Sequence, residues 1–283
     1  VAPSVRNSGT IRARVGKVAL AAGDTYTLDL AGDRLVELGL GAGHAVVDQS
    51  GKIVNAGGTV TITAKAAGQV VDSVINMSGV TDASAVKTAG GQIILGGDDI
   101  NVASNAVLKS DGASGGQITA VANKTGNYAG TYSAQGTTGD GGQIETSGHT
   151  VNVASDAKIT AASAHGKAGK WTLDPVDITI AASGGDVATG TIEASLTSGT
   201  SVSITTAQGS GGNGDLTLAS SINATSTGNA GLTLTGRHLS ATGGSAVNIT
   251  GGALTLNVNT VNNTAAPSGT WIVDAIGMIG NVT

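Results

Sequence analysis

A short motif returns along this chain at a nearly constant interval, and few folds permit that. The tetrapeptide Gly-Gly-Gln-Ile begins at Gly90, again at Gly115 and again at Gly141. A related segment, Ala168-Gly169-Lys170-Trp171, follows at the next such interval. An interval of roughly 25 residues, built from short strands and turns, is typical of a β-solenoid, whose coils stack and bury each other's apolar residues.

Stretches in which apolar and polar residues alternate occur along the whole chain, for example at residues 59–63, 201–205 and 232–234. Alternation with a period of two is the pattern of a strand with one buried face. Helical periodicity is almost absent. We therefore predict an all-β fold, a parallel β-helix (β-solenoid) of about 12–14 coils.

The composition agrees with a narrow, stacked core. Glycine supplies 46 of the 283 residues, aromatic residues make up 2%, and Phe is missing. Gly, Asn, Asp and Ser suit sharp corners, and a thin interior suits Val, Ile, Leu and Ala. We expect Ile93, Ile118, Ile144 and Trp171 to point inward at equivalent positions of successive coils. A β-sandwich or barrel is the structural alternative, but it would bring hairpin turns roughly every 8–12 residues.

Charge and hydropathy exclude two classes of partner. The net charge is −5 and the 14 Lys and Arg residues are scattered, whereas duplex binding requires a basic face, so we expect no nucleic acid. No apolar run approaches the roughly 20 residues of a membrane-spanning helix, so we expect no membrane insertion. The chain has no Cys, which removes thiol chemistry and zinc–thiolate sites.

No pattern of residues predicts catalysis, a metal site or a cofactor. The four His residues form no zincin-type pair, and no glycine-rich loop ends in Gly-Lys-Ser/Thr. Residues 211–216 (Gly-Gly-Asn-Gly-Asp-Leu) resemble a calcium-binding solenoid turn, but this turn occurs once and lacks one residue. We therefore expect no enzyme. The alternative is a carbohydrate-active β-helix enzyme, which would need carboxylates and basic residues gathered in one groove.

Four segments share their order and spacing with one family of secreted proteins. They are residues 17–23 (Lys-Val-Ala-Leu-Ala-Ala-Gly), 28–33 (Leu-Asp-Leu-Ala-Gly-Asp), 57–64 (Gly-Gly-Thr-Val-Thr-Ile-Thr-Ala) and 169–180 (Gly-Lys-Trp-Thr-Leu-Asp-Pro-Val-Asp-Ile-Thr-Ile). In these segments the chain resembles filamentous haemagglutinin-like exoproteins of two-partner secretion systems, over roughly residues 5–180. The resemblance implies a right-handed parallel β-helix, exported through a dedicated outer-membrane transporter. The Asn-Pro motifs of that family's secretion domain are missing, so the chain looks like the shaft segment after that domain.

A Trp-containing segment divides the chain into two parts. Residues 169–174 (Gly-Lys-Trp-Thr-Leu-Asp) are echoed by residues 269–274 (Gly-Thr-Trp-Ile-Val-Asp). We expect haemagglutinin-like coils over residues 1–180, and further solenoid coils over residues 181–283. In this interpretation Trp171 and Trp271 fill the core where the coil changes cross-section. Asp174 and Asp274 cap turns, and Pro175 prevents a ladder hydrogen bond.

Two further features concern glycans. A glycan-binding module without catalysis, the second alternative function, would use the aromatic side chains of Trp171, Trp271, Tyr128 and Tyr132. Asn-Xaa-Ser/Thr sequons, the acceptors of N-glycosylation, occur at Asn76, Asn123, Asn223, Asn248, Asn262 and Asn281. Because Asn and Thr are abundant, six sequons are near the number expected by chance.

Together these observations predict a non-enzymatic structural rod segment of a large secreted bacterial adhesin or extracellular fibre, at the cell surface or in the biofilm matrix. The expected partners are host-cell or matrix glycans or proteins, and the outer-membrane transporter during secretion. We also expect end-to-end self-association, because unpaired strand edges template pairing with another chain and residues 276–283 carry no charge.

Overall fold

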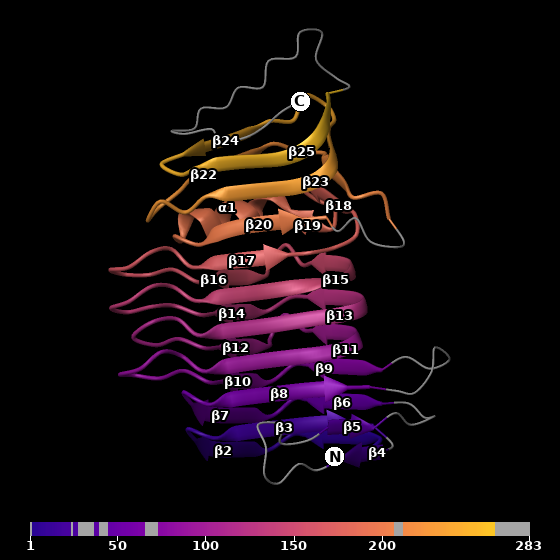
Figure 1. The fold of residues 1–283 in the computed structure, drawn as a ribbon, viewed down its shortest axis with the longest axis vertical. Coiled ribbons are helices and arrows are strands. Elements are labelled where there is room, and N and C mark those ends of the chain that lie inside the picture. Colours follow the sequence, from indigo (N-terminus) through magenta and orange to yellow (C-terminus); the bar gives the residue numbers. More distant parts are fainter. Residues whose placement is uncertain are drawn as a thin grey trace.

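The computed structural model describes residues 2–23, 25–27, 37–39, 45–65, 73–206 and 212–263. In this part the chain is nearly all β-structure, with one α-helix. The strands pair in parallel with strands of the preceding and following turns of chain, and the turns are stacked along the long axis (Figure 1). The predicted all-β fold with parallel strands is confirmed, and the arrangement is compatible with a β-helix.

Equivalent strands of successive turns lie above one another in three columns. The first column contains β3 (Lys17–Ala22), β8 (Thr59–Ala64), the first halves of β11 (Gln92–Val102), β13 (Gln117–Tyr128) and β15 (Gln143–Val153), then β17 (Lys170–Leu173), β20 (Ser201–Thr205) and the first halves of β23 (Leu232–Ala241) and β25 (Leu254–Asn263).

The second column contains β1 (Ser4–Asn7), β6 (Val46–Gln49), β9 (Val74–Met77), the second halves of β11, β13 and β15, β19 (Val187–Ala188), β18 (Ile178–Ala181), β21 (Asp215–Leu218) and the second halves of β23 and β25. The third column contains β2 (Thr10–Arg14), β7 (Lys52–Ala56), β10 (Val80–Asp82), β12 (Val107–Lys109), β14 (Thr131–Ser133) and β16 (Lys158–Thr160), and further along β22 (Ile222–Thr225) and β24 (Val247–Thr250).

Two features depart from a uniform parallel stack. The long strands bend between the first and second columns, where the register shifts between Gly97 and Asp99 and again between Ala122 and Thr125. Such β-bulges bend a strand and turn its side chains to a new direction. In addition, β4 (Thr25–Thr27) and β5 (Glu37–Gly39) form an antiparallel pair.

The turns of chain vary in length. Lys17 is paired with Thr59, whereas Gln92 is paired with Gln117, so the turn that begins at Lys17 contains many more residues. The first column holds nine strands in the described residues, and the roughly 12–14 coils expected for the whole chain stay a prediction. A longer turn uses more residues per coil, so a chain of a given length makes fewer coils.

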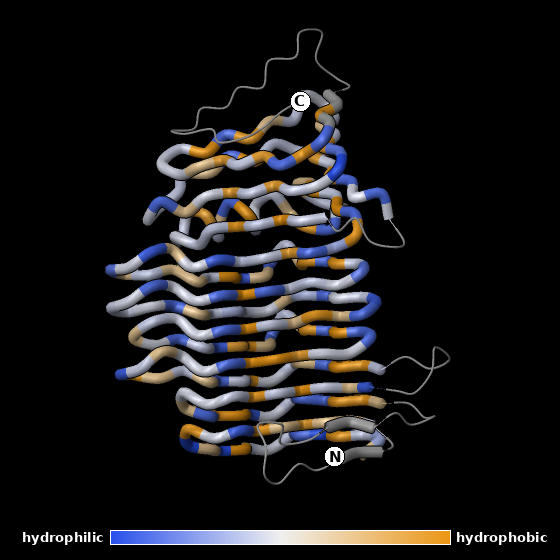
Figure 2. Tube along the Cα trace, in the orientation of Figure 1, coloured by the Kyte–Doolittle hydropathy of each residue, from blue (hydrophilic) through white to orange (hydrophobic). Residues whose placement is uncertain are grey.

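The core consists of apolar side chains stacked in register. Ile93 lies beside Ile118, Ile118 beside Ile144, and Ile144 beside Trp171. Each of the four is at most 1% exposed, and this is the placement that the repeat predicts. Full burial of one such side chain stabilises the fold by about 1.5–3 kcal/mol. Apolar and polar residues alternate along the turns in Figure 2.

The glycines of the repeat form a tight corner before each strand of the first column. A Cβ at Gly91, Gly116 or Gly142 would overlap the carbonyl oxygen of the corner glycine one turn below. The backbones approach this closely because the next residue donates to that oxygen, as Gln117 N does to Gly91 O over 3.0 Å. The motif therefore needs glycine for close approach of two backbones.

A single nine-residue helix, α1 (Thr189–Thr197), occurs in the described residues, in keeping with the near absence of helical periodicity, although no local pattern predicted its position. It contains Gly190 and three Thr residues, which are weak helix formers, and its N-terminus has no side-chain cap. The helix packs between β16 and β22 in the third column, where Ile192 and Leu196, one turn apart, are fully buried. Tertiary packing has overridden local propensity here.

Candidate functional surfaces

A ladder of side-chain amides runs along the outside of the second column. The amides of Asn76, Asn101, Asn127 and Asn152 form it, and the carboxylate of Asp48 accepts the first hydrogen bond; the five residues come from successive strands. Each Asn donates through Nδ2 to the Oδ1 one turn below, over 2.8, 3.2, 2.8 and 2.9 Å in chain order. Because each amide keeps a second N–H, the ladder offers hydrogen-bond donors about 4.8 Å apart.

The amide ladder was not predicted from the sequence. The spacing from Asn76 to Asn101, Asn127 and Asn152 is 25, 26 and 25 residues, which matches the interval of the Gly-Gly-Gln-Ile repeat. That shared interval was a signal that could have found it. Amide pairs on other strands include Gln92 Nε2, which donates to Gln117 Oε1 over 3.2 Å, and Asn248 Nδ2, which donates to Asn223 Oδ1 over 2.7 Å.

Most of the sequon side chains already make hydrogen bonds within the protein. Asn76 belongs to the amide ladder, and Asn223 and Asn248 bond to each other. Asn123 Nδ2 donates to Asp98 Oδ1 over 3.0 Å. Asn262 lies in β25, and Asn281 lies outside the described residues. Glycosylation at these sites stays a prediction.

Asp98 is a strongly bonded carboxylate at the bend between the first and second columns. Besides the bond from Asn123, its Oδ2 accepts from the backbone N–H of Ser73 over 3.2 Å, and its own N–H donates to Ser73 Oγ over 2.9 Å. Burial acts to raise the pKa of Asp98, but these hydrogen bonds and the nearby charge of Lys124 outweigh it and lower the pKa. The carboxylate is therefore ionised, and its hydrogen bonds hold the bend in place.

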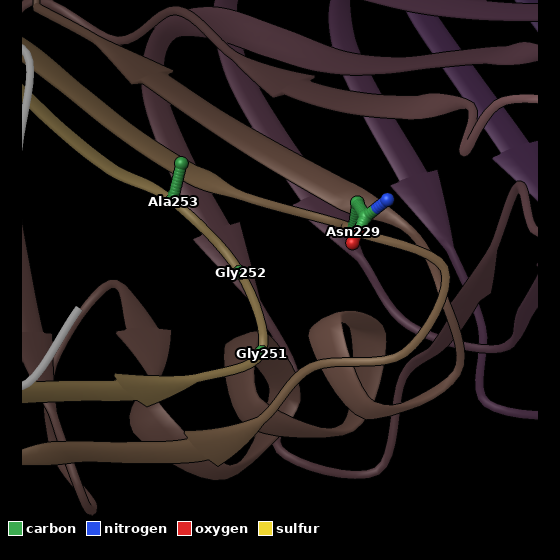
Figure 3. A pocket seen from close by; sticks show the side chains of 4 residues that line it. All are labelled: Asn229, Gly251, Gly252 and Ala253. Carbon is green, nitrogen blue, oxygen red and sulfur yellow. The ribbon is translucent and has the colours of Figure 1, made fainter. Parts of the chain in front are cut away.

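The hollows on the described surface include three shallow ones, of about 300, 230 and 260 Å³. The first is lined by Asn229, Gly251, Gly252 and Ala253, and Figure 3 shows that only Asn229 brings a polar side chain to it. The second lies over Gly96 and Gly97, with Lys65, Val121 and Asn123 around it. The third is lined by small residues between β15 and the segment that joins β18 to β19. Among these linings Lys65 is the one titratable side chain, so none of the three combines an acid with a base.

The turn whose sequence resembles a calcium-binding motif is held by hydrogen bonds to the carboxylate of Asp177. Asp177 Oδ1 accepts from the backbone N–H groups of Asn213 and Asp215, over 3.0 and 2.8 Å. The N–H groups of this turn thus bind a carboxylate of the chain. Within the described ranges, no three His, Asp or Glu side chains gather as metal ligands would.

The aromatic side chains considered for glycan stacking are buried where the structure describes them. Trp171, Tyr128 and Tyr132 are at most 1% exposed. The indole N–H of Trp171 donates to Thr146 Oγ1 over 2.9 Å. Tyr128 OH is 2.9 Å from Ala120 O and 2.6 Å from Ser147 O, and burial raises the pKa values of both Tyr hydroxyls. The glycan-platform alternative therefore fails for these three side chains, because they fill the core instead.

The expected turn cap at Asp174 is absent from the described part of the chain, where its carboxylate accepts no hydrogen bond. Surrounding chain partly shields this carboxylate from water, which raises its pKa. Pro175 follows β17 and is buried. Trp271 and Asp274 lie outside the described residues, so the second Trp segment stays a prediction.

Comparison of the sequence with protein-family models and with curated proteins found no match in either set. In the part of the chain that the structure describes, no helix has the length and hydropathy needed to cross a bilayer.

Proposed function

We propose that this chain is a right-handed parallel β-helix that serves as a non-enzymatic rod segment of a secreted bacterial adhesin or extracellular fibre. The observation that supports the proposal is the register of the repeat. Gln92-Ile93 pairs with Gln117-Ile118, which pairs with Gln143-Ile144. A unit that pairs with its own copies above and below extends in one direction, and the product of such extension is a rod.

In this proposal the rod carries binding surfaces away from the cell. The amide ladder is the surface that we assign to contact with host-cell or matrix glycans, since the neutral amides of its four Asn residues, at regular spacing, suit polyhydroxylated ligands. The family resemblance supports export through an outer-membrane transporter and a place at the cell surface or in the biofilm matrix. End-to-end association of rods through their terminal strands would lengthen the fibre.

A glycan array tests the binding role, and release of reducing sugar from the same glycans tests the enzyme alternative. We expect the purified chain to retain glycans without cleaving them. Asn101→Ala combined with Asn127→Ala should abolish retention, whereas the matched pair Gln92→Ala with Gln117→Ala, on the first column, should not. Sugar release would refute the non-enzymatic role, and equal retention by both double variants would refute the assignment to the amide ladder.

Sedimentation at rising chain concentration tests self-association. We expect the average mass to increase with concentration, because the terminal strands of a stack have unpaired edges. A strictly monomeric boundary throughout would refute end-to-end association and leave the rod proposal standing.

A further inference from the structure

The turn of chain that contains α1 is joined to the turn below it by little backbone pairing. In the regular layer beneath, β13 and β15 share ten paired positions, and β14 and β16 share three. In the next layer β15 pairs with β17 at three positions and with β19 at one. In the third column of this layer the helix stands where a strand would be, so the backbone ladder is broken there.

Side chains replace part of the lost ladder. In a regular turn, Ala134 N donates to the backbone oxygen of Thr160 over 2.9 Å. One turn later Ala161 N donates to a hydroxyl instead, Thr200 Oγ1, over 2.8 Å. Ser195 Oγ on α1 reaches Ile159 O over 3.2 Å. These bonds satisfy buried groups, but they are isolated and do not form a continuous ladder.

The second column of the same layer is also irregular. The two-residue strand β19 is inserted between β15 and β18, since Val187 pairs with Val153 on one side and Ile180 on the other. The hollow of about 260 Å³ lies beside this insertion, lined in part by Val153, Ser155 and Gly184. This layer therefore combines few ladder bonds with a solvent-accessible hollow at its rim.

We propose that the layer is a built-in joint, at which the stack separates into two cooperative blocks, one formed by strands β1–β16 and the other by strands β20–β25, before either block unfolds. The stability of a stacked repeat is approximately a sum of interface terms between neighbours, so one weak interface divides its cooperativity. Opening at the joint would release the chain around α1 and lengthen the molecule while both blocks stay folded. The inference rests on strand pairing and does not depend on the proposed adhesin function.

Engineered disulfides across defined layers test the joint, and the absence of native Cys makes them unambiguous. Glu145→Cys with Thr172→Cys links β15 to β17 across the joint. The matched control, Thr119→Cys with Glu145→Cys, links β13 to β15 in the regular layer. Both pairs are register partners on the outer face, and adjacent strands lie about 4.8 Å apart, within the Cα separation of a disulfide.

We expect urea unfolding of the unmodified chain to show two transitions. Backbone amides of α1 should exchange hydrogen at least about tenfold faster than those of β13, as in a unit that opens locally. The oxidised joint disulfide should slow exchange in α1 and raise the first midpoint, and reduction should reverse both effects. The control disulfide should leave α1 exchange unchanged. A single transition with equal protection of α1 and β13 would overturn the proposal, as would equal effects of the two disulfides on α1.

Discussion

Replacing Ile118 by Asp tests the core register most severely. Ile118 is fully buried between Ile93 and Ile144, so the new carboxyl group cannot reach water without moving the strand. Losing the buried aliphatic side chain costs about 2 kcal/mol. Keeping a carboxyl group with an ordinary pKa near 3.9 protonated at pH 7 costs about 4 kcal/mol more. Together the two effects predict a loss of about 6 kcal/mol at pH 7.

The pH dependence separates the two parts of this loss. The folded-state pKa of the buried Asp is raised, so its destabilising effect is smallest below the unfolded pKa and grows as pH rises towards the folded pKa. The loss should fall to about 2 kcal/mol near pH 4 and grow by about 1.4 kcal/mol per pH unit above it. Urea titrations followed by circular dichroism at pH 4, 5, 6 and 7 measure this, on the transition that includes the first block.

Gln117→Asp is the matched control, because Gln117 precedes Ile118 on the same strand and is exposed. A surface change of this kind should alter the stability by no more than about 0.5 kcal/mol. If Ile118→Asp and Gln117→Asp shift the urea midpoint equally, or if the Ile118→Asp loss is independent of pH, the inward register described here is wrong.

Individual contacts lead to three further predictions. Gly142→Ala should lower the melting temperature, because the new Cβ would overlap the backbone oxygen of Gly116. Gly96→Ala should be tolerated, because the atom nearest to its new Cβ would be Thr63 Cγ2 at 3.9 Å. Equal melting temperatures of the two variants would contradict the corner packing. Thr200→Val should cost about 1–3 kcal/mol, because it leaves the buried N–H of Ala161 without its acceptor, and a urea titration that detects no loss would contradict that role. The pKa of Asp98 is lowered in the folded state, so its carboxylate contributes stability above the unfolded pKa, and this stability is lost as pH falls through the folded pKa. Asp98→Asn should therefore make the melting temperature depend less on pH in acid. An unchanged acid slope would contradict this contribution of Asp98.

The repeat interval and the alternating pattern were enough to predict strands, parallel pairing and the inward column of Ile93, Ile118, Ile144 and Trp171. These features are local or periodic, so residues one interval apart have the same environment. The same periodicity also applies to Tyr128, whose burial was not predicted. Tyr128 pairs with Val102 and Val153, so comparison with those apolar equivalents would have placed its ring in the core.

Other features could not be predicted from any local pattern. The helix α1 has weak helix formers and no cap, and it forms because Ile192 and Leu196 are buried against β16 and β22. Those strands are far away in the sequence, and only stacking brings them to either side of the helix. The hydroxyl of Thr200 likewise becomes an acceptor for the backbone N–H of Ala161, 39 residues earlier, only because the helix stands where the regular strand would be.

The sequence by itself determined the repeating unit, because alternation and glycine corners act within one turn of chain. Tertiary structure alone decided where the stack is interrupted, because that depends on which distant surfaces meet when the turns pack.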